Sequence, residues 1–234
     1  MRRVIRAAFI LALAAALLLS GCGPAAPAKE PEPSDGEITP EETPALTEDA
    51  AADVAINPVF ALYCEVIPLY RAAWRGAVTG AAGDEAAAGL LLLMMSDEAR
   101  LCGAFSAVGM LPPSEDGNGF SGSVTAPIPG EGRLHANGSF SFTGEDGLTL
   151  SGSYEDGVFT CSDGESEIVL APLGDGFITA VTSADGTGVT ELTSSGLRYA
   201  RIEGAGRYDP AAQGFPEEGS PVLVCSGSEV RVDE

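Results

Sequence analysis

The chain has 234 residues with 12 basic and 34 acidic side chains, so its net charge at pH 7 is −22. Nucleic-acid binding requires clustered lysine and arginine against the phosphates, and this composition argues against a nucleic-acid partner. It also argues against a basic surface that attaches to anionic lipid headgroups.

The first 22 residues have the layout of an export signal. Three arginines among the first six residues precede 13 apolar residues, 7–19, and the run ends in Leu19-Ser20-Gly21-Cys22. A basic start and a short apolar run are typical of a secretory signal, whereas a membrane-spanning helix needs about 20 apolar residues. The last four residues resemble the lipobox of bacterial lipoproteins.

The resemblance covers this segment alone and carries three implications. Residues 1–21 are a signal peptide that is removed, and Cys22 becomes the first residue and carries fatty acyl chains such as palmitate. Membrane lipid is therefore the implied partner of the acylated Cys22. The mature chain is then held at the extracytoplasmic face of a bacterial membrane, where two acyl chains on one residue give stable attachment.

Residues 22–53 form an acidic, proline-rich segment behind the lipidated cysteine. It contains six prolines and nine acidic residues, and its apolar residues are mostly alanine. A segment of this kind cannot bury enough apolar surface to offset its conformational entropy, so we expect a disordered tether. It would reach about 95 Å as polyproline II and about 30 Å as a flexible coil. Without the three signal-peptide arginines, 9 basic and 34 acidic residues remain, a net charge of −25.

Residues 57–110 have helical patterning. Asn57-Pro58 suits an N-cap and the first helical position, and apolar residues then recur at spacings of three and four. Pro68 falls inside this pattern and predicts a kink or a break into two short helices. Asp84 suits the cap of a second helix that contains the apolar run 90–95, and Ser96-Asp97-Glu98 suits a restart.

The pattern changes to strand-like alternation from about residue 119. Asp-Gly pairs at residues 146, 156, 175 and 185 suit tight hairpin turns and indicate an antiparallel meander. Eleven short runs are expected as strands: 121–128, 132–135, 139–143, 148–154, 158–162, 167–171, 177–183, 189–193, 197–203, 221–226 and 229–232. The apolar face of such a sheet must be covered, and we expect side chains of adjacent strands to line it: Phe140, Phe142, Leu148, Leu150 and Tyr154.

These elements predict an α+β fold over residues 54–234, in one domain. The N-terminal helices, 57–110, would pack on the antiparallel β-meander, 119–234. The meander itself would be a curved sheet or a partly closed barrel.

The four cysteines that follow Cys22 leave two alternatives open. Export to an oxidising compartment permits two disulfides, for which we favour Cys64 with Cys102 and Cys161 with Cys225. The alternative is four buried free thiols, since cysteine packs as a small apolar side chain. The chain has one histidine and no C-x-x-C pair, so we expect no metal site and no cofactor.

Few residues suggest a functional site. The helix-face aromatics Phe60, Tyr63, Tyr70 and Trp74 would form either a core or the wall of an apolar ligand cavity. The acidic turns at residues 145–146 and 155–156 would supply paired carboxylates to a hydrolase. His135, the single histidine, lies in a strand-to-turn segment without a nearby nucleophile motif.

The sequence therefore favours a membrane-anchored extracytoplasmic lipoprotein that binds a ligand or partner without catalysis. The ligand or partner itself is not identified. The alternatives are a cell-envelope hydrolase that uses paired carboxylates and a structural spacer at the cell surface.

Overall fold

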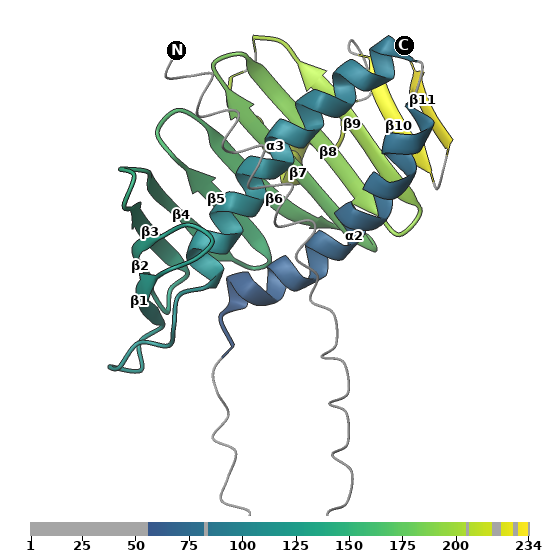
Figure 1. The fold of residues 1–234 in the computed structure, drawn as a ribbon. Coiled ribbons are helices and arrows are strands. Elements are labelled where there is room, and N and C mark those ends of the chain that lie inside the picture. Colours follow the sequence, from purple (N-terminus) through teal and green to yellow (C-terminus); the bar gives the residue numbers. More distant parts are fainter. Residues whose placement is uncertain (1–55, 82–83, 205, 217–220, 227–228, 234) are drawn as a thin grey trace, which may run out of the picture.

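The computed structural model describes residues 56–81, 84–204, 206–216, 221–226 and 229–233 (Figure 1). Within these residues two long helices precede a run of strands: α2, Pro58–Gly80, and α3, Glu85–Gly109. The strands are β1 Phe120–Val124, β2 Gly130–Leu134, β3 Ser139–Gly144, β4 Thr149–Glu155, β5 Val158–Ser162, β6 Glu167–Leu173, β7 Gly176–Ser183, β8 Gly186–Thr193, β9 Gly196–Ile202, β10 Val222–Ser226 and β11 Glu229–Asp233. A short helix, α4, Pro210–Gln213, lies between β9 and β10.

Both long helices begin at the caps that the sequence indicates. The Asn57 side chain accepts a hydrogen bond from the Val59 amide at 3.0 Å and donates one to the Val108 carbonyl at 2.9 Å. The Asp84 carboxylate accepts from the amides of the second and third residues of α3, at 3.0 and 3.1 Å. Each cap satisfies amides that a helix start leaves unpaired, and Asn57 also joins the start of α2 to the end of α3.

The two expected interruptions do not break the helices. α2 runs without interruption through Pro68, and α3 runs through residues 96–98 without a restart. Pro68 is exposed, and so is Cys64, whose carbonyl loses its helical partner because proline has no N–H. Water can bond to that carbonyl on the exposed side of the helix, which makes an unbroken helix tolerable at this position.

The strands form one sheet in the order in which they occur along the chain, β1 to β11, and every neighbouring pair is antiparallel. The α+β class and the antiparallel meander are therefore confirmed. The sheet is open, because the described parts of β1 and β11 do not pair, so a closed barrel is excluded. All four Asp-Gly pairs lie at strand junctions, and at Asp156-Gly157 both residues have positive φ, 50° and 80°, as a two-residue hairpin of type I′ requires.

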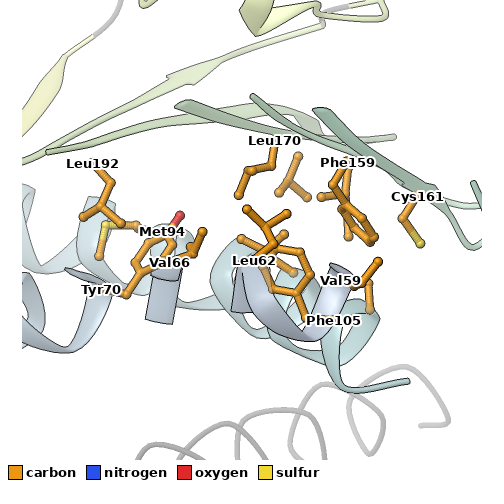
Figure 2. Close-up of a cluster of buried hydrophobic side chains, with 14 of the residues drawn as sticks. Val59, Leu62, Val66, Tyr70, Met94, Phe105, Phe159, Cys161, Leu170 and Leu192 are labelled. Atoms are coloured by element: carbon orange, nitrogen blue, oxygen red, sulfur yellow. The ribbon is translucent and has the colours of Figure 1, made fainter. Parts of the chain in front are cut away.

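The helices cover one face of the sheet, as Figure 1 shows. Figure 2 shows α2 and α3 side chains directed at those of the strands, with Tyr70 and Met94 near Leu192 and with Phe105 near Phe159. The Phe105 and Phe159 ring centroids are 4.9 Å apart, a separation typical of favourable aromatic pairs. The predicted inner face is also present, since three of its five residues are buried and two are partly buried in the same cluster: Phe140, Phe142, Leu150, Leu148 and Tyr154.

The opposite face of the sheet is covered only in part. A second, smaller apolar cluster includes Ile178, Val189 and Phe215, with Tyr208 packed against it, and α4 contacts β6 and β7. Residues 206–216 thus cover the middle strands. On β1 to β5, alternate residues of the same face are exposed or half-buried. Part of the sheet therefore presents a bare face away from the helices.

Candidate functional site

The aromatic residues of α2 belong to the packing between helices and sheet. Tyr70 and Trp74 are buried, with 1% and 8% of their surfaces exposed. The Tyr70 hydroxyl lies 3.4 Å from Thr179 Oγ1 of β7. Phe60 and Tyr63 are half-buried and stack with ring centroids 6.2 Å apart. The structure thus divides the predicted ligand wall into two core residues and two residues at the border of the core.

Beside these aromatics, α3 buries a carboxylate against the sheet. Asp97 is 6% exposed, and its Oδ2 accepts hydrogen bonds from the Tyr199 hydroxyl at 2.9 Å and from Arg201 Nη1 at 3.4 Å. Gly188 of β8 leaves room for it, because a Cβ there would lie 1.9 Å from Oδ2. Burial raises the pKa of Asp97, whereas Tyr199, Arg201 and Arg100 act to lower it. This arrangement links α3 to β8 and β9.

The next residue, Glu98, points toward α2. It is 5% exposed, and its Oε2 accepts a hydrogen bond from Trp74 Nε1. Its Oε1 has no hydrogen-bond partner within the described residues. Burial raises the pKa of Glu98 to about 7, although the Trp74 bond opposes that rise. Burial and the charge of Glu98 together raise the pKa of Cys102.

Asp97 and Glu98 are functional candidates that the sequence analysis missed. Ser96-Asp97-Glu98 suits a helix restart, yet the position of Asp97 within the apolar spacing also indicates burial. Asp97 lies seven residues after Leu90 and four before Leu101, on the inner face of an amphipathic helix. Asp97 bonds to β9 and Glu98 bonds to α2, so the two carboxylates have separate partners. This geometry supports a structural role rather than a shared reaction centre.

The cysteines are free thiols in the structure. Cys64 is exposed on α2, and Cys102, Cys161 and Cys225 are buried. Cys161 lies on β5 and Cys225 on β10, which are five strand steps apart in the sheet order. At about 4.8 Å a step the separation is about 24 Å, and a disulfide needs Cα atoms within about 7 Å. The strand order therefore keeps this predicted pair apart.

The acidic turns do not converge. Residues 145–146 precede β4, whereas Glu155 is its last residue and Asp156 follows it, so the two acidic pairs lie at opposite ends of one strand. β4 has seven residues and spans about 23 Å at about 3.3 Å each. Paired carboxylates of a glycoside hydrolase lie about 5–10 Å apart. These turns therefore do not supply the pair that the hydrolase alternative requires.

His135 borders a hollow at the β1 to β4 end of the molecule. The hollow has a volume of about 400 Å³, and its lining includes Asn137, Tyr154 and Glu155. His135 itself is exposed. Asn137 Oδ1 accepts from the Ser139 amide at 3.1 Å and so holds the β2–β3 turn. The polar groups here serve the turn, as the strand-to-turn position of His135 predicts.

The bare face of β1 to β5 has an unusual composition. Strand registry places the side chains of this face in cross-strand rows, and ten of the fourteen are serine or threonine. We call this surface the hydroxyl face; it consists of Ser121, Ser123, Glu131, Arg133, Ser139, Ser141, Thr143, Thr149, Ser151, Ser153, Glu155, Val158, Thr160 and Ser162. One row crosses all five strands through Ser121, Arg133, Ser141, Ser151 and Ser162.

The hydroxyl face carries little charge in a strongly acidic chain. Its charged side chains are Glu131, Arg133 and Glu155, a net charge of −1, and Glu155 lies at the end of β4. Arg133 also pairs with Asp116 beside β1, with Nη2 and Oδ2 3.0 Å apart. Further exposed acidic residues occupy the connecting turns, at 145–146, 156 and 165. The fold thus places most of the acidic groups around the centre of this surface rather than on it.

No protein-family model, curated protein or solved structure matches this chain. Among the described helices, none combines the length and the apolar content needed to cross a bilayer. The described ranges also hold no group of three or more histidine, cysteine, aspartate or glutamate side chains that could bind a metal ion.

Proposed function

We propose that this chain is a membrane-anchored extracytoplasmic lipoprotein whose folded part binds a partner without catalysis. The observation that carries the proposal is the segment Leu19-Ser20-Gly21-Cys22, directly after 13 apolar residues and a basic start. The signal, Cys22 and residues 23–53 lie outside the described residues, so the anchor rests on the sequence.

The anchor and the tether have a simple physical role. Each buried CH₂ of an acyl chain contributes about 0.8 kcal/mol to membrane attachment, so two chains hold the protein firmly where one is marginal. The acidic, proline-rich segment 23–53 then separates the folded part from the bilayer. The mature chain as a whole carries a net charge of −25, which repels it from anionic headgroups.

The binding role is supported by the hydroxyl face. Ten serine and threonine side chains occupy one exposed side of five strands, turned away from the helices that cover the sheet. The hydrolase alternative lacks its carboxylate pair at the turns around β4. A spacer would have no use for a patterned surface with so many hydroxyl groups, and we therefore favour a binding module.

Metabolic labelling tests the anchor. Cells that express the full chain are fed an alkyne-tagged palmitate, and the purified protein is examined for label and for its N-terminus. We expect label on the wild type, loss of label in Cys22→Ala, and loss of the mutant from the membrane fraction. Cys64→Ala is the matched control, because Cys64 is an exposed cysteine of the folded part, and it should be labelled normally. Normal processing and membrane retention of Cys22→Ala would refute the proposal.

A further inference from the structure

We propose that the hydroxyl face binds an uncharged polysaccharide chain. The inference deepens the proposed function, which gives the protein an extracytoplasmic location and a binding role. It depends on three properties of the surface: its hydroxyl groups, its charge and its shape.

The hydroxyl groups are available to a ligand. Ser141, Thr143, Thr149 and Ser151 lie exposed at the centre of the face, and their hydroxyls have no hydrogen-bond partner within the described residues. Others bond to each other, as Ser153 Oγ and Thr160 Oγ1 do at 3.0 Å. A serine or threonine hydroxyl donates one hydrogen bond and accepts two. The hydroxyls of a sugar have the same capacity, so the two surfaces can bond in either direction.

The charge distribution selects against ionic partners. On the face Arg133 is set against Glu131 and Glu155, the central side chains are uncharged, the turns around the face are acidic and the mature chain carries −25. Anionic polymers such as nucleic acids and acidic glycans would be repelled by that border. A cationic partner would be drawn to the turns and not to the neutral centre. An uncharged ligand is neither repelled by the acidic border nor drawn away from the centre to the turns.

The shape and composition argue against the two other common ligand classes. Protein interfaces have an apolar centre rich in aromatic residues, methionine and arginine, and they are depleted in serine. The hydroxyl face has no aromatic or methionine side chain and a single arginine. Small molecules bind in enclosed, mostly apolar pockets, whereas this surface is one exposed side of a sheet. The ligand class that these properties favour is therefore a polymer that contacts many hydroxyls at once.

The spacing suits a chain of repeating units. Neighbouring strands are about 4.8 Å apart, and residues on one face of a strand recur about every 7 Å. The row through Ser141 and Ser151 therefore spans about 19 Å over five strands and offers polar side chains at regular intervals. Each bond to an exposed hydroxyl is weak, but several bonds along one chain act together, because each one already formed raises the effective concentration for the next.

Affinity electrophoresis tests the inference with the full chain in detergent. Native gels contain dextran, laminarin or hydroxyethyl cellulose as neutral probes, and alginate as the acidic probe. We expect at least one neutral polymer to retard the wild type and alginate to have no effect. The S141A/S151A variant removes two central hydroxyls and should weaken binding about fivefold for each, the effect of losing about 1 kcal/mol per hydrogen bond.

Three further variants make the outcome specific to the surface. S141T/S151T keeps both hydroxyls and should bind like the wild type. S194A/S195A makes the same chemical change in the exposed β8–β9 turn, away from the face, and should also bind normally. S141D adds a carboxylate to the centre and should weaken binding as S141A/S151A does. Circular dichroism verifies that each variant is folded.

Several results would overturn the inference. They are an absence of retardation by every neutral polymer, equal retardation by alginate, unchanged binding of S141A/S151A, or an equal loss in S194A/S195A. Capture of a protein partner through the face in place of a glycan would also contradict it. The assay does not depend on lipidation, so polymer binding that persists after a negative palmitate result refutes the anchor alone. Labelled Cys22 with no polymer binding refutes the glycan assignment and leaves the anchor intact.

Discussion

Replacing Glu98 with glutamine is expected to make the free energy of unfolding less sensitive to pH, so that the variant becomes more stable relative to the wild type as the pH rises through 7. Glu98 is buried between α3 and α2, and its charged form has one hydrogen bond, from Trp74. A buried carboxylate with so little solvation favours its neutral form. Tyr70 and Cys102 lie near enough for the charge of Glu98 to raise their pKa values.

The sign and magnitude follow from proton linkage. Burial raises the pKa of Glu98 from 4.5 to about 7, so the folded state binds this proton more tightly than the unfolded chain. The stabilisation from that proton is complete below about pH 4.5 and is lost as the pH rises through about 7. Each pKa unit corresponds to about 1.36 kcal/mol, so the full loss is about 3 kcal/mol at pH 8.

Glutamine remains neutral at every pH and keeps an oxygen that can accept from Trp74. Its extra N–H₂ group lacks a partner near the position of Oε1, and an unsatisfied buried donor costs about 1–3 kcal/mol at all pH values. The informative quantity is therefore how the stability difference between the two proteins changes with pH. From pH 5 to pH 8 we expect the free energy of unfolding of Glu98→Gln to rise by about 3 kcal/mol relative to that of the wild type.

Urea unfolding followed by far-ultraviolet circular dichroism measures this difference at pH 5, 6, 7 and 8. Fluorescence is avoided as the main signal, because Trp74 is the only tryptophan and contacts the altered side chain. Glu145→Gln, in an exposed turn, is the control and should follow the wild type within about 0.5 kcal/mol. Parallel stability profiles for wild type and Glu98→Gln across pH 5–8 would refute the reasoning, because Glu98 would then be solvated when the protein is folded.

Two further substitutions probe the helix–sheet and helix–helix contacts. Gly188→Ala should destabilise the fold by about 1–3 kcal/mol in thermal unfolding, because its Cβ would lie 1.9 Å from the Asp97 carboxylate; an unchanged midpoint would contradict the placement of Asp97. Asn57→Ala should cost about 1–3 kcal/mol, since it removes both the cap of α2 and the bond to the Val108 carbonyl. A loss no larger than that of an exposed surface substitution would contradict that double role.

Local patterning was sufficient to predict the starts of the two long helices and the eleven strands, although not the short helix α4. The caps at Asn57 and Asp84, the Asp-Gly turns and the strand-like alternation each depend on neighbours within a few residues along the chain. All eleven expected runs overlap a strand of the structure. The buried face through Phe140 and Phe142 was predictable for the same reason, since side chains alternate between the two faces of a strand.

The candidate site was much less accessible to such reasoning. Cys161 and Cys225 lie in similar strands, and only the order of pairing places them five steps apart. The burial of Asp97 and Glu98 depends on which elements pack against α3. The continuity of α2 through Pro68 depends on the exposure of that side of the helix. The hydroxyl face requires knowledge of strand registry and of which strands residues 206–216 cover.

By itself the sequence determined the acidic balance and the succession of helices and strands, and it predicts an export signal with a lipidation site. These properties are written in residues that are adjacent or a few positions apart, where steric preference and periodicity act directly. Tertiary structure alone decided which side of the sheet the helices cover, which carboxylates lose solvent, and which serines and threonines share one surface. Those outcomes arise from contacts between residues far apart along the chain, and no local pattern specifies them.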